Sequence, residues 1–298
     1  MPGKLNVKNQ VNPEQGRIFN SQSDKNMDKV KFEDLLGTGA HFGHVTRKWN
    51  PNFKPYILSD KNGVHIIDLE QTIDSINKAC EFIKNLVSKN GEILFVGTKK
   101  QAQDIIQQEA DRCSMFYIVE RWLGGTLTNF STIKKSIKRL KMLEKEGSNL
   151  YTNMTKKETQ MLNREKVKLA DQHRGIKDMR RLPDVLVVVD AQYEDTAIRE
   201  AKRLEIPVVA IVDSNTNPKK VDYPIPANDD SMRTIQIIIA ALADSVLEAR
   251  TEKTTDKKET KNKSDNKLAK NSIDDKKFEL EDDVSDDNNT DDGKLEEE

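Results

Sequence analysis

The sequence predicts an α/β fold in which a parallel sheet is flanked by helices and an antiparallel coiled-coil hairpin is inserted. Short runs rich in valine and isoleucine alternate with amphipathic helical patterns, as in a βαβ domain. Runs such as Val185–Val189 are continuously apolar, as expected of parallel strands buried on both faces. A stretch over about residues 128–177 interrupts the alternation and has no strand pattern.

The expected elements alternate between strand and helix on both sides of this interruption. A chain of 298 residues is long enough to bury a full core around them. In chain order they are strand Val64–Ile67, a helix over about 72–89, strand Ile93–Val96, a helix over about 100–112, strand Met115–Val119, then strand Val185–Val189, a helix over about 194–204, strand Val208–Val212 and a helix over about 229–249.

A basic amphipathic helix opens the interruption, shortly after the segment Arg121–Gly125. Apolar residues three, four and three positions apart give it one face for packing. The remaining faces are cationic and are expected to contact the phosphates of a polyanion. The apolar residues are Phe130, Ile133, Ile137 and Leu140, and the cations are Lys134, Lys135, Lys138, Arg139 and Lys141.

A second helix is expected after a connection over about residues 147–155. Leu162, Leu169 and Ile176 recur at intervals of seven, which predicts that the two helices form the antiparallel coiled-coil hairpin. Further lysines keep the second helix basic. A charged face that serves only solvation is the alternative interpretation.

The two ends of the chain differ in composition from the middle. Residues 1–27 are rich in asparagine, glutamine and lysine, which predicts a flexible extension. Residues 251–298 carry 10 basic and 17 acidic side chains, which predicts a disordered acidic tail and leaves residues 1–250 basic by +6. Residues 28–250 are therefore expected to form the folded domain.

Cysteine usage and hydropathy indicate the compartment. Cys80 and Cys113 fall in helical patterns and are expected to be buried, reduced thiols. Apolar runs such as Ile237–Leu242 are far shorter than the roughly 20 residues that cross a bilayer. The sequence therefore predicts a cytoplasmic protein without membrane contact.

The segment from Arg47 to Tyr56 interleaves cations with aromatic rings and contains two helix-breaking prolines. Its cations, Arg47, Lys48 and Lys54, are expected to meet RNA phosphates. Trp49 and Tyr56 suit either stacking on bases or packing in the core, and both alternatives stay open.

Gly97–Lys100 connects an expected strand to an expected helix, where phosphate-binding loops lie. Its order does not match a P-loop, and the chain contains no Gly-x-Gly-x-x-Gly. An ordinary strand-to-helix turn is the favoured interpretation, with Lys99 and Lys100 as phosphate contacts.

His41–His44 has the form His-x-Gly-His, with which one class of aminoacyl-tRNA synthetases and related nucleotidyl transferases binds ATP. In those enzymes the motif opens a helix and is completed by a Lys-Met-Ser-Lys-Ser-type loop. Here an extended basic segment follows, and no such loop occurs. No zinc site is expected either, because no cysteine lies nearby in sequence and no acidic residue completes a ligand cluster.

Acidic residues are expected where strands end, at positions that α/β enzymes use for catalysis or metal binding. Asp190, Asp213, Asp229 and Asp230 also suit turns and a helix start, which is the simpler interpretation. A nucleotide- or tRNA-handling α/β enzyme that uses these aspartates with His41 and His44 is the alternative function. No nucleophile elbow or His-x-x-x-His accompanies them.

Several segments together carry a resemblance to one family. They are His41–His44 with Trp49–Pro51, Val64–Leu69, Ile93–Lys99, Arg121–Gly125 with Leu127–Asn129, Gly175–Met179, Ile206–Pro207 with Ile211–Asp213, and Ile225–Asp230. In order and spacing, over about residues 28–248, they resemble the bacterial small-ribosomal-subunit protein two family. The resemblance implies a flavodoxin-like α/β domain with a protruding coiled-coil hairpin, seated between the head and body of the subunit.

The chain departs from the family at the end of the hairpin. Arg174 stands where the family generally has a second glycine, and Arg180 and Arg181 stand where it often has glycine or lysine. We expect this junction to be more basic and stiffer than usual.

The resemblance and the charge pattern together predict a structural constituent of the small ribosomal subunit without enzymatic activity. Its expected partners are ribosomal RNA and neighbouring ribosomal proteins, including the mRNA-binding protein one, with no cofactor, metal, small-molecule substrate or membrane. A non-ribosomal adaptor that binds protein through the hairpin is a further alternative. The expected RNA-binding residues are Arg47, Lys48, Trp49, Lys54, Lys99, Lys100, Arg121, Lys134, Lys135, Lys138 and Arg139.

Overall fold

The computed structural model describes residues 29–145 and 155–253. Its main sheet has five parallel strands in the spatial order β5-β4-β6-β7-β8. Taken in chain order within the sheet, this arrangement is the flavodoxin-like order 2-1-3-4-5. The predicted α/β fold with a parallel sheet is therefore confirmed. The strands are β4 (Ile93–Val96), β5 (Phe116–Ile118), β6 (Val185–Val189), β7 (Val208–Val212) and β8 (Tyr223–Pro226).

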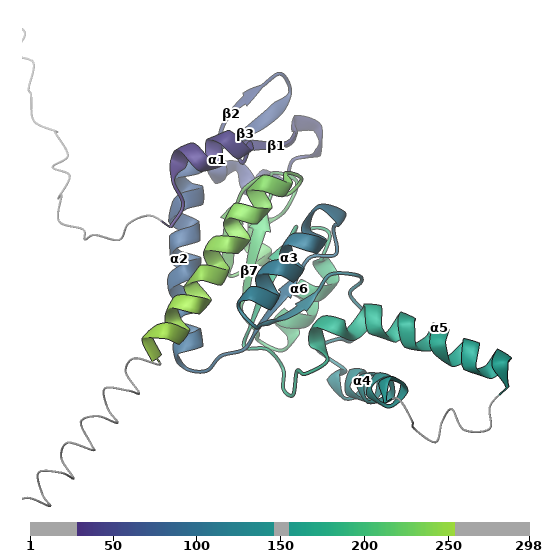
Figure 1. Cartoon of the computed structure of the whole chain (residues 1–298). Coiled ribbons are helices and arrows are strands. Elements are labelled where there is room, and N and C mark those ends of the chain that lie inside the picture. The colour runs from purple at the N-terminus through teal and green to yellow at the C-terminus, as the bar shows by residue number, and fades with distance from the viewer. Residues whose placement is uncertain (1–28, 146–154, 254–298) are drawn as a thin grey trace, which may run out of the picture.

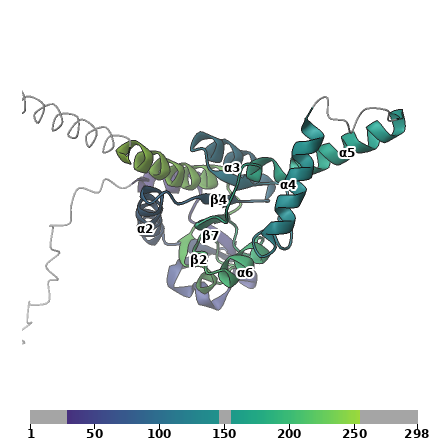
Figure 2. The same cartoon turned by 90° about the horizontal axis from the view of Figure 1, so that it is seen from below.

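Helices cover both faces of this sheet (Figure 1, Figure 2). Because successive side chains of a strand point to opposite faces, Phe95 and Val187 belong to one core and Leu94 and Val188 to the other. The first core is shared with α2 (Leu69–Ser88), α3 (Lys100–Arg112) and the helix over residues 232–253. The second is shared with α6 (Asp195–Arg203) and α4 (Phe130–Glu144).

A second, antiparallel sheet with the order β1-β3-β2 lies beside α1 (Phe32–Thr38) (Figure 1). It comprises β1 (Phe42–Val45), β2 (Ile57–Lys61) and β3 (Val64–Ile67). The expectation that Val64–Ile67 opens the parallel βαβ series is wrong, because β3 pairs only with β1 and β2. β1 and β2 were not predicted, since few of their side chains are buried and their hydrophobic pattern is weak.

Strand β8 was also not predicted. It contains Pro224 and Pro226, which lack the backbone N–H that a central strand needs. β8 lies at the edge of the main sheet and pairs with β7 alone, where proline is tolerated. Its last residues lead directly into the Asp229–Asp230 turn.

The interruption contains two helices, as predicted, and they project away from the sheets (Figure 1). α4 is followed by α5 (Lys156–His173), which begins with a capping box between Thr155 and Glu158. The antiparallel coiled coil is not confirmed: in both views the two helices cross and do not run alongside each other (Figure 1, Figure 2). Arg139 of α4 pairs with Glu165 of α5 through two hydrogen bonds of 3.0 and 3.2 Å.

Several expectations fall on parts of the chain outside the described residues. These are the extension over residues 1–27, the acidic tail beyond residue 253 and most of the 147–155 connection. Within the described residues, no helix is both long and apolar enough to span a bilayer. Cys80 and Cys113 are buried and form no disulfide, as predicted.

Gly175 lies where the chain returns from the hairpin to the sheet, in the short 3-10 helix η3 (Arg174–Ile176). A Cβ atom at this position would lie 2.2 Å from the carbonyl oxygen of Tyr117, which is too close for any real contact. We expect Gly175→Ala to lower the free energy of unfolding by about 1–3 kcal/mol, measured by urea denaturation. Gly124→Ala is the matched control, because a Cβ there meets nothing within 4 Å; equal losses in both variants would contradict the packing explanation.

Candidate functional site

The exposed face of α4 carries a row of lysines. Ile133, Ile137, Leu140 and Leu143 are buried, so the opposite face, with Lys134, Lys135 and Lys138, is exposed. Within the described residues none of these three lysines has an acidic partner; Lys134 lies 4.7 Å from the centre of the Phe130 ring. Arg139 differs, because Glu165 already neutralises it. The helix therefore presents three uncompensated positive charges to solvent.

A groove of about 450 Å³ lies between α4 and the segment that follows the hairpin. Lys134, Lys138 and Lys141 line one side of it, and Lys177 and Arg180 line the other. Lys141 is bound to Asp178 at 2.9 Å, and Lys177 is bound to Glu144. Lys134, Lys138 and Arg180 keep their charge available, so the groove suits a phosphate group.

Arg121 lies on the other side of the hairpin and is exposed. It borders a hollow of about 610 Å³ against α5, together with Arg164 and Lys168. Glu120 and Asp171 also line this hollow, so its charge is mixed. The positive surface is therefore concentrated on the α4 side.

One buried carboxylate holds the loop that leads into α4. The Oε1 atom of Glu200, on α6, accepts hydrogen bonds from the indole Nε1 of Trp122 at 3.1 Å and the backbone N–H of Gly125 at 2.7 Å. Its Oε2 atom accepts from the backbone N–H groups of Leu127 and Thr128 and from the Thr128 hydroxyl. Burial disfavours the ionised carboxylate and so raises the pKa of Glu200, but the hydrogen bonds outweigh this effect. The pKa of Glu200 therefore lies below its usual value. Glu200 thus fixes the direction in which α4 starts.

Sequence reasoning missed Glu200, although a signal for it exists. Glu200 lies three residues after Ala197 and one before Ala201, which are both buried, and so it falls on the inner face of α6. A lone acidic residue on a buried face requires several hydrogen-bond donors nearby. The backbone N–H groups of Gly125, Leu127 and Thr128 supply them.

His173 joins the C-terminal end of α5 to α4. Its Nε2 atom is hydrogen-bonded to the Ser136 hydroxyl at 2.8 Å, whereas its Nδ1 atom is buried without a partner in the described part of the chain. Burial therefore lowers the pKa of His173 from 6.5.

Because the folded protein binds this proton less readily than the unfolded chain, His173 contributes stability above pH 6.5 that is lost as the pH falls towards its folded pKa. We expect the stability difference between wild type and His173→Gln to shrink as the pH is lowered from 7 to 5, measured by urea denaturation. A difference that stays constant over this range would contradict the argument.

The segment that interleaves cations with aromatic rings forms the 3-10 helices η1 (Thr46–Lys48) and η2 (Pro51–Tyr56). Arg47, Lys48 and Lys54 are exposed, and no acidic partner holds them within the described ranges. Phe53 is fully buried, and the ring of Trp49 is half-buried, with its centre 5.3 Å from that of His65. Phe53 and Trp49 therefore pack the segment against the rest of the protein, while its cations face solvent.

The two lysines after β4 have different environments. Lys100 is exposed at the start of α3. The Nζ atom of Lys99 instead lies 2.9 Å from Asp229, 2.6 Å from Asp230 and 3.4 Å from Asp190. Burial disfavours the ammonium, but the hydrogen bonds to Asp230 and Asp229 outweigh it and raise the pKa of Lys99. Lys99 is thus an internal counter-ion.

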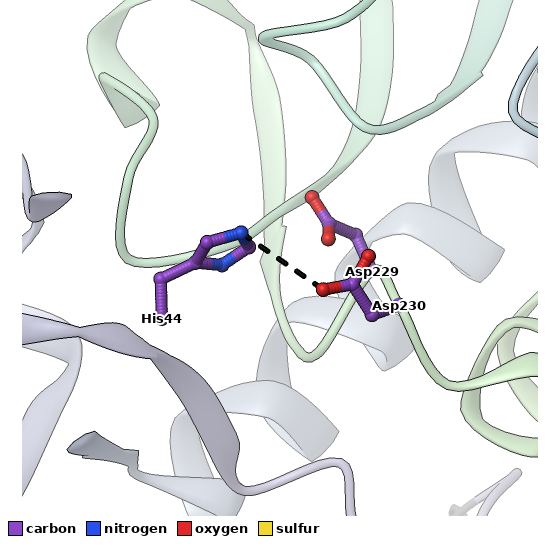
Figure 3. Close-up of side chains that lie close together, drawn as sticks. All are labelled: His44, Asp229 and Asp230. Carbon is purple, nitrogen blue, oxygen red and sulfur yellow. Dashed lines mark ion pairs between the residues drawn. The ribbon is translucent and has the colours of Figure 1, made fainter.

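His44 lies in the same cluster, at the carboxyl edge of the main sheet. Its Nδ1 atom is hydrogen-bonded to the Asp213 carboxylate at 2.8 Å, which raises the pKa of His44, and its Nε2 atom lies 3.9 Å from Asp230. Figure 3 shows its imidazole facing the carboxylates of Asp229 and Asp230. The expectation that no acidic residue completes a cluster with this histidine is wrong, because β1 of the small sheet lies against the carboxyl edge of the main sheet and brings His44 next to residues about 170 positions away.

A family model described as ribosomal protein S2 matches residues 35–249. The chain belongs to the ribosomal protein S2 family. The match covers both sheets, the hairpin and most of the last helix, and so includes the lysine row of α4, the Glu200 loop and the His44 cluster. It confirms membership of the ribosomal protein S2 family, as predicted from the motifs, whereas the bacterial type stays a prediction. The chain is accordingly a ribosomal protein of the small subunit that acts in translation.

Membership of the ribosomal protein S2 family agrees with the charge at the carboxyl edge of the sheet. Enzymes with this strand order bind nucleotides at that edge, between the strands here called β4 and β6. In this chain the position holds the carboxylates of Asp190, Asp213, Asp229 and Asp230 against the ammonium of Lys99 and the imidazole of His44. A backbone N–H of the His-Phe-Gly-His segment is bound to Ser214 at 2.8 Å. The excess negative charge repels a polyphosphate.

Proposed function

We propose that this ribosomal protein S2 family member is a bacterial, structural constituent of the small subunit, without enzymatic activity. It binds ribosomal RNA and neighbouring ribosomal proteins between the head and the body. The observation that carries the RNA-binding part is the row of three uncompensated lysines on α4 beside the groove of about 450 Å³. Double-stranded RNA is recognised mostly through its backbone and shape, which suits such a surface.

The proposed RNA-binding residues form two groups. The first lies around the hairpin and consists of Lys134, Lys135, Lys138 and Arg121. The second consists of Arg47, Lys48 and Lys54 on η1 and η2, with Lys100 at the start of α3. Two of the residues expected from sequence, Lys99 and Arg139, neutralise carboxylates of the protein itself. The ring of Trp49 lies 5.3 Å from that of His65 and remains partly exposed, so its contact with RNA stays part of the proposal.

We propose protein contacts on the side of α1 and the small sheet. Phe32 and Leu36 of α1, Phe42 and Val45 of β1, and Leu58 of β2 are large apolar side chains that remain exposed. Exposed apolar side chains concentrated on neighbouring elements are typical of protein interfaces. Neighbouring small-subunit proteins, protein one among them, are the proposed occupants, on ribosomes in the cytoplasm.

Reconstitution tests this function directly. Small-subunit particles assembled without their own family member should take up the purified full-length chain in a one-to-one ratio, measured by quantitative mass spectrometry of pelleted particles. Complete particles are the control and should take up none. Failure of the deficient particles to bind the chain would overturn the proposal.

Calorimetry separates the proposal from the enzyme alternative. The proposal predicts no binding heat when ATP is titrated to millimolar concentration, because the carboxyl edge carries excess negative charge. Saturable heat that disappears in His44→Ala would instead favour a nucleotide-handling enzyme.

A further inference from the structure

We propose that His44, Asp229 and Asp230 form a binding site for a divalent transition-metal ion, with zinc preferred, at the carboxyl edge of the main sheet. One ligand atom from each of the three residues lies within 4.8 Å of the other two. The residues come from β1 and from the turn after β8, so a bound ion would link the small sheet to the main sheet. Figure 3 shows the three side chains pointing toward one another.

The hydrogen bond that His44 Nδ1 donates to Asp213 orients His44 as a ligand. A carboxylate at 2.8 Å from Nδ1 favours the tautomer in which Nδ1 carries the proton, leaving the lone pair on Nε2. Metal-binding histidines commonly have such a carboxylate behind them, because it orients the ring and raises its basicity. The Nε2 atom faces Asp230, and only the side-chain amide of Asn215, at 3.2 Å, has to move aside.

Asp229 supplies a second, independent indication. Its side chain is completely buried, and the Oδ2 atom has no hydrogen-bond partner in the part of the chain that the structure describes. Lys99 occupies the other oxygen, Oδ1, and also binds Oδ1 of Asp230. Oδ2 of Asp229 and Oδ2 of Asp230 are therefore left for a cation.

The charge of the cluster points in the same direction. Three carboxylates, those of Asp190, Asp229 and Asp230, lie within 3.4 Å of the single ammonium of Lys99, and a fourth, that of Asp213, is bound to His44. Buried carboxylates that exceed their counter-ions are costly unless they take up a proton or a metal ion.

The donor set decides the kind of metal. One imidazole nitrogen with two carboxylate oxygens suits zinc, whereas magnesium prefers oxygen donors and retains its water. Ligands around a tetrahedral zinc ion lie about 3.3 Å apart, so the three side chains need to approach one another by up to about 1.5 Å. Asp230 is 59% exposed, so its carboxylate has room to make this movement while Oδ1 stays close to Lys99.

The test uses the untagged full-length chain, stripped with a chelator and titrated with zinc chloride in a calorimeter, with magnesium chloride in parallel. We expect about one zinc ion per chain and at least tenfold weaker magnesium binding. Asp230→Asn, an exposed position that should leave the fold intact, is expected to weaken zinc binding at least tenfold. Asp60→Asn, on the exposed strand β2, is the matched control and should bind zinc like the wild type.

Thermal denaturation provides the second measurement, because a ligand that binds only the folded state raises its melting temperature. Zinc should raise the melting temperature of the wild type and of Asp60→Asn, but not that of Asp230→Asn. Absence of zinc binding to the wild type would overturn the proposal, as would equal binding by the two variants.

Discussion

Replacing Lys134, Lys135 and Lys138 of α4 by glutamine is expected to weaken binding to small-subunit ribosomal RNA roughly 100-fold at about 0.1 M salt. The three side chains are exposed and have no acidic partner in the described residues, so their replacement removes phosphate contacts without breaking an internal ion pair. Each lost phosphate contact lowers the slope of log affinity against log salt by about 0.7–0.9, giving a total change of about 2–3. Filter binding over a range of salt concentrations measures both quantities.

A second triple variant is the control for a general effect of net charge on RNA affinity. Lys31, Lys202 and Lys219 are exposed and lie outside the proposed surface, and their replacement by glutamine removes the same charge. We expect this variant to keep nearly the wild-type affinity and slope. Arg139 is left unchanged in both variants because it is bound to Glu165. An unchanged salt slope in the α4 variant would contradict the assignment of this helix to RNA.

Glu200→Ala is expected to lower the free energy of unfolding by about 3 kcal/mol, because buried backbone donors of the loop before α4 are left without an acceptor. For a domain of this size the loss corresponds to a fall of about 6–12 °C in the melting temperature, measured by calorimetry. The loop sets the start of α4, so we also expect RNA affinity to fall although no phosphate contact is removed.

Glu81→Ala is the control for Glu200→Ala. Glu81 is an exposed glutamate on α2, and its replacement should change the free energy of unfolding by less than about 0.5 kcal/mol. Equal melting temperatures for the two variants would show that Glu200 does not hold the loop.

The parallel sheet was predictable from sequence because its central strands are wholly buried. β4, β6 and β7 are buried at every position, and their apolar runs identify them without tertiary information. β1 and β2 gave no such signal, since most of their residues remain exposed. β3 has a clear pattern, but a local pattern does not reveal which sheet a strand joins.

Some residues of the candidate site were likewise predictable from local sequence, and others were not. The lysines of α4 were identified because a helical period separates them from the buried face, a purely local property. The partners of Glu200 lie 72–78 residues away, and those of His44 about 170 residues away. Only the packing of elements distant in sequence brings such groups together, which is why His44 appeared to have no acidic neighbour. Likewise, the three aspartates around Lys99 become visible only in the folded chain.

Sedimentation tests the central claim most directly. The chain, tagged in its native cell, is followed through a sucrose gradient at low and then at raised salt. Membership of the small subunit through electrostatic RNA contacts predicts co-migration with that subunit at low salt and progressive loss as the salt concentration rises. Migration at low salt as a free species near its own mass of 34.0 kDa would contradict the proposed function.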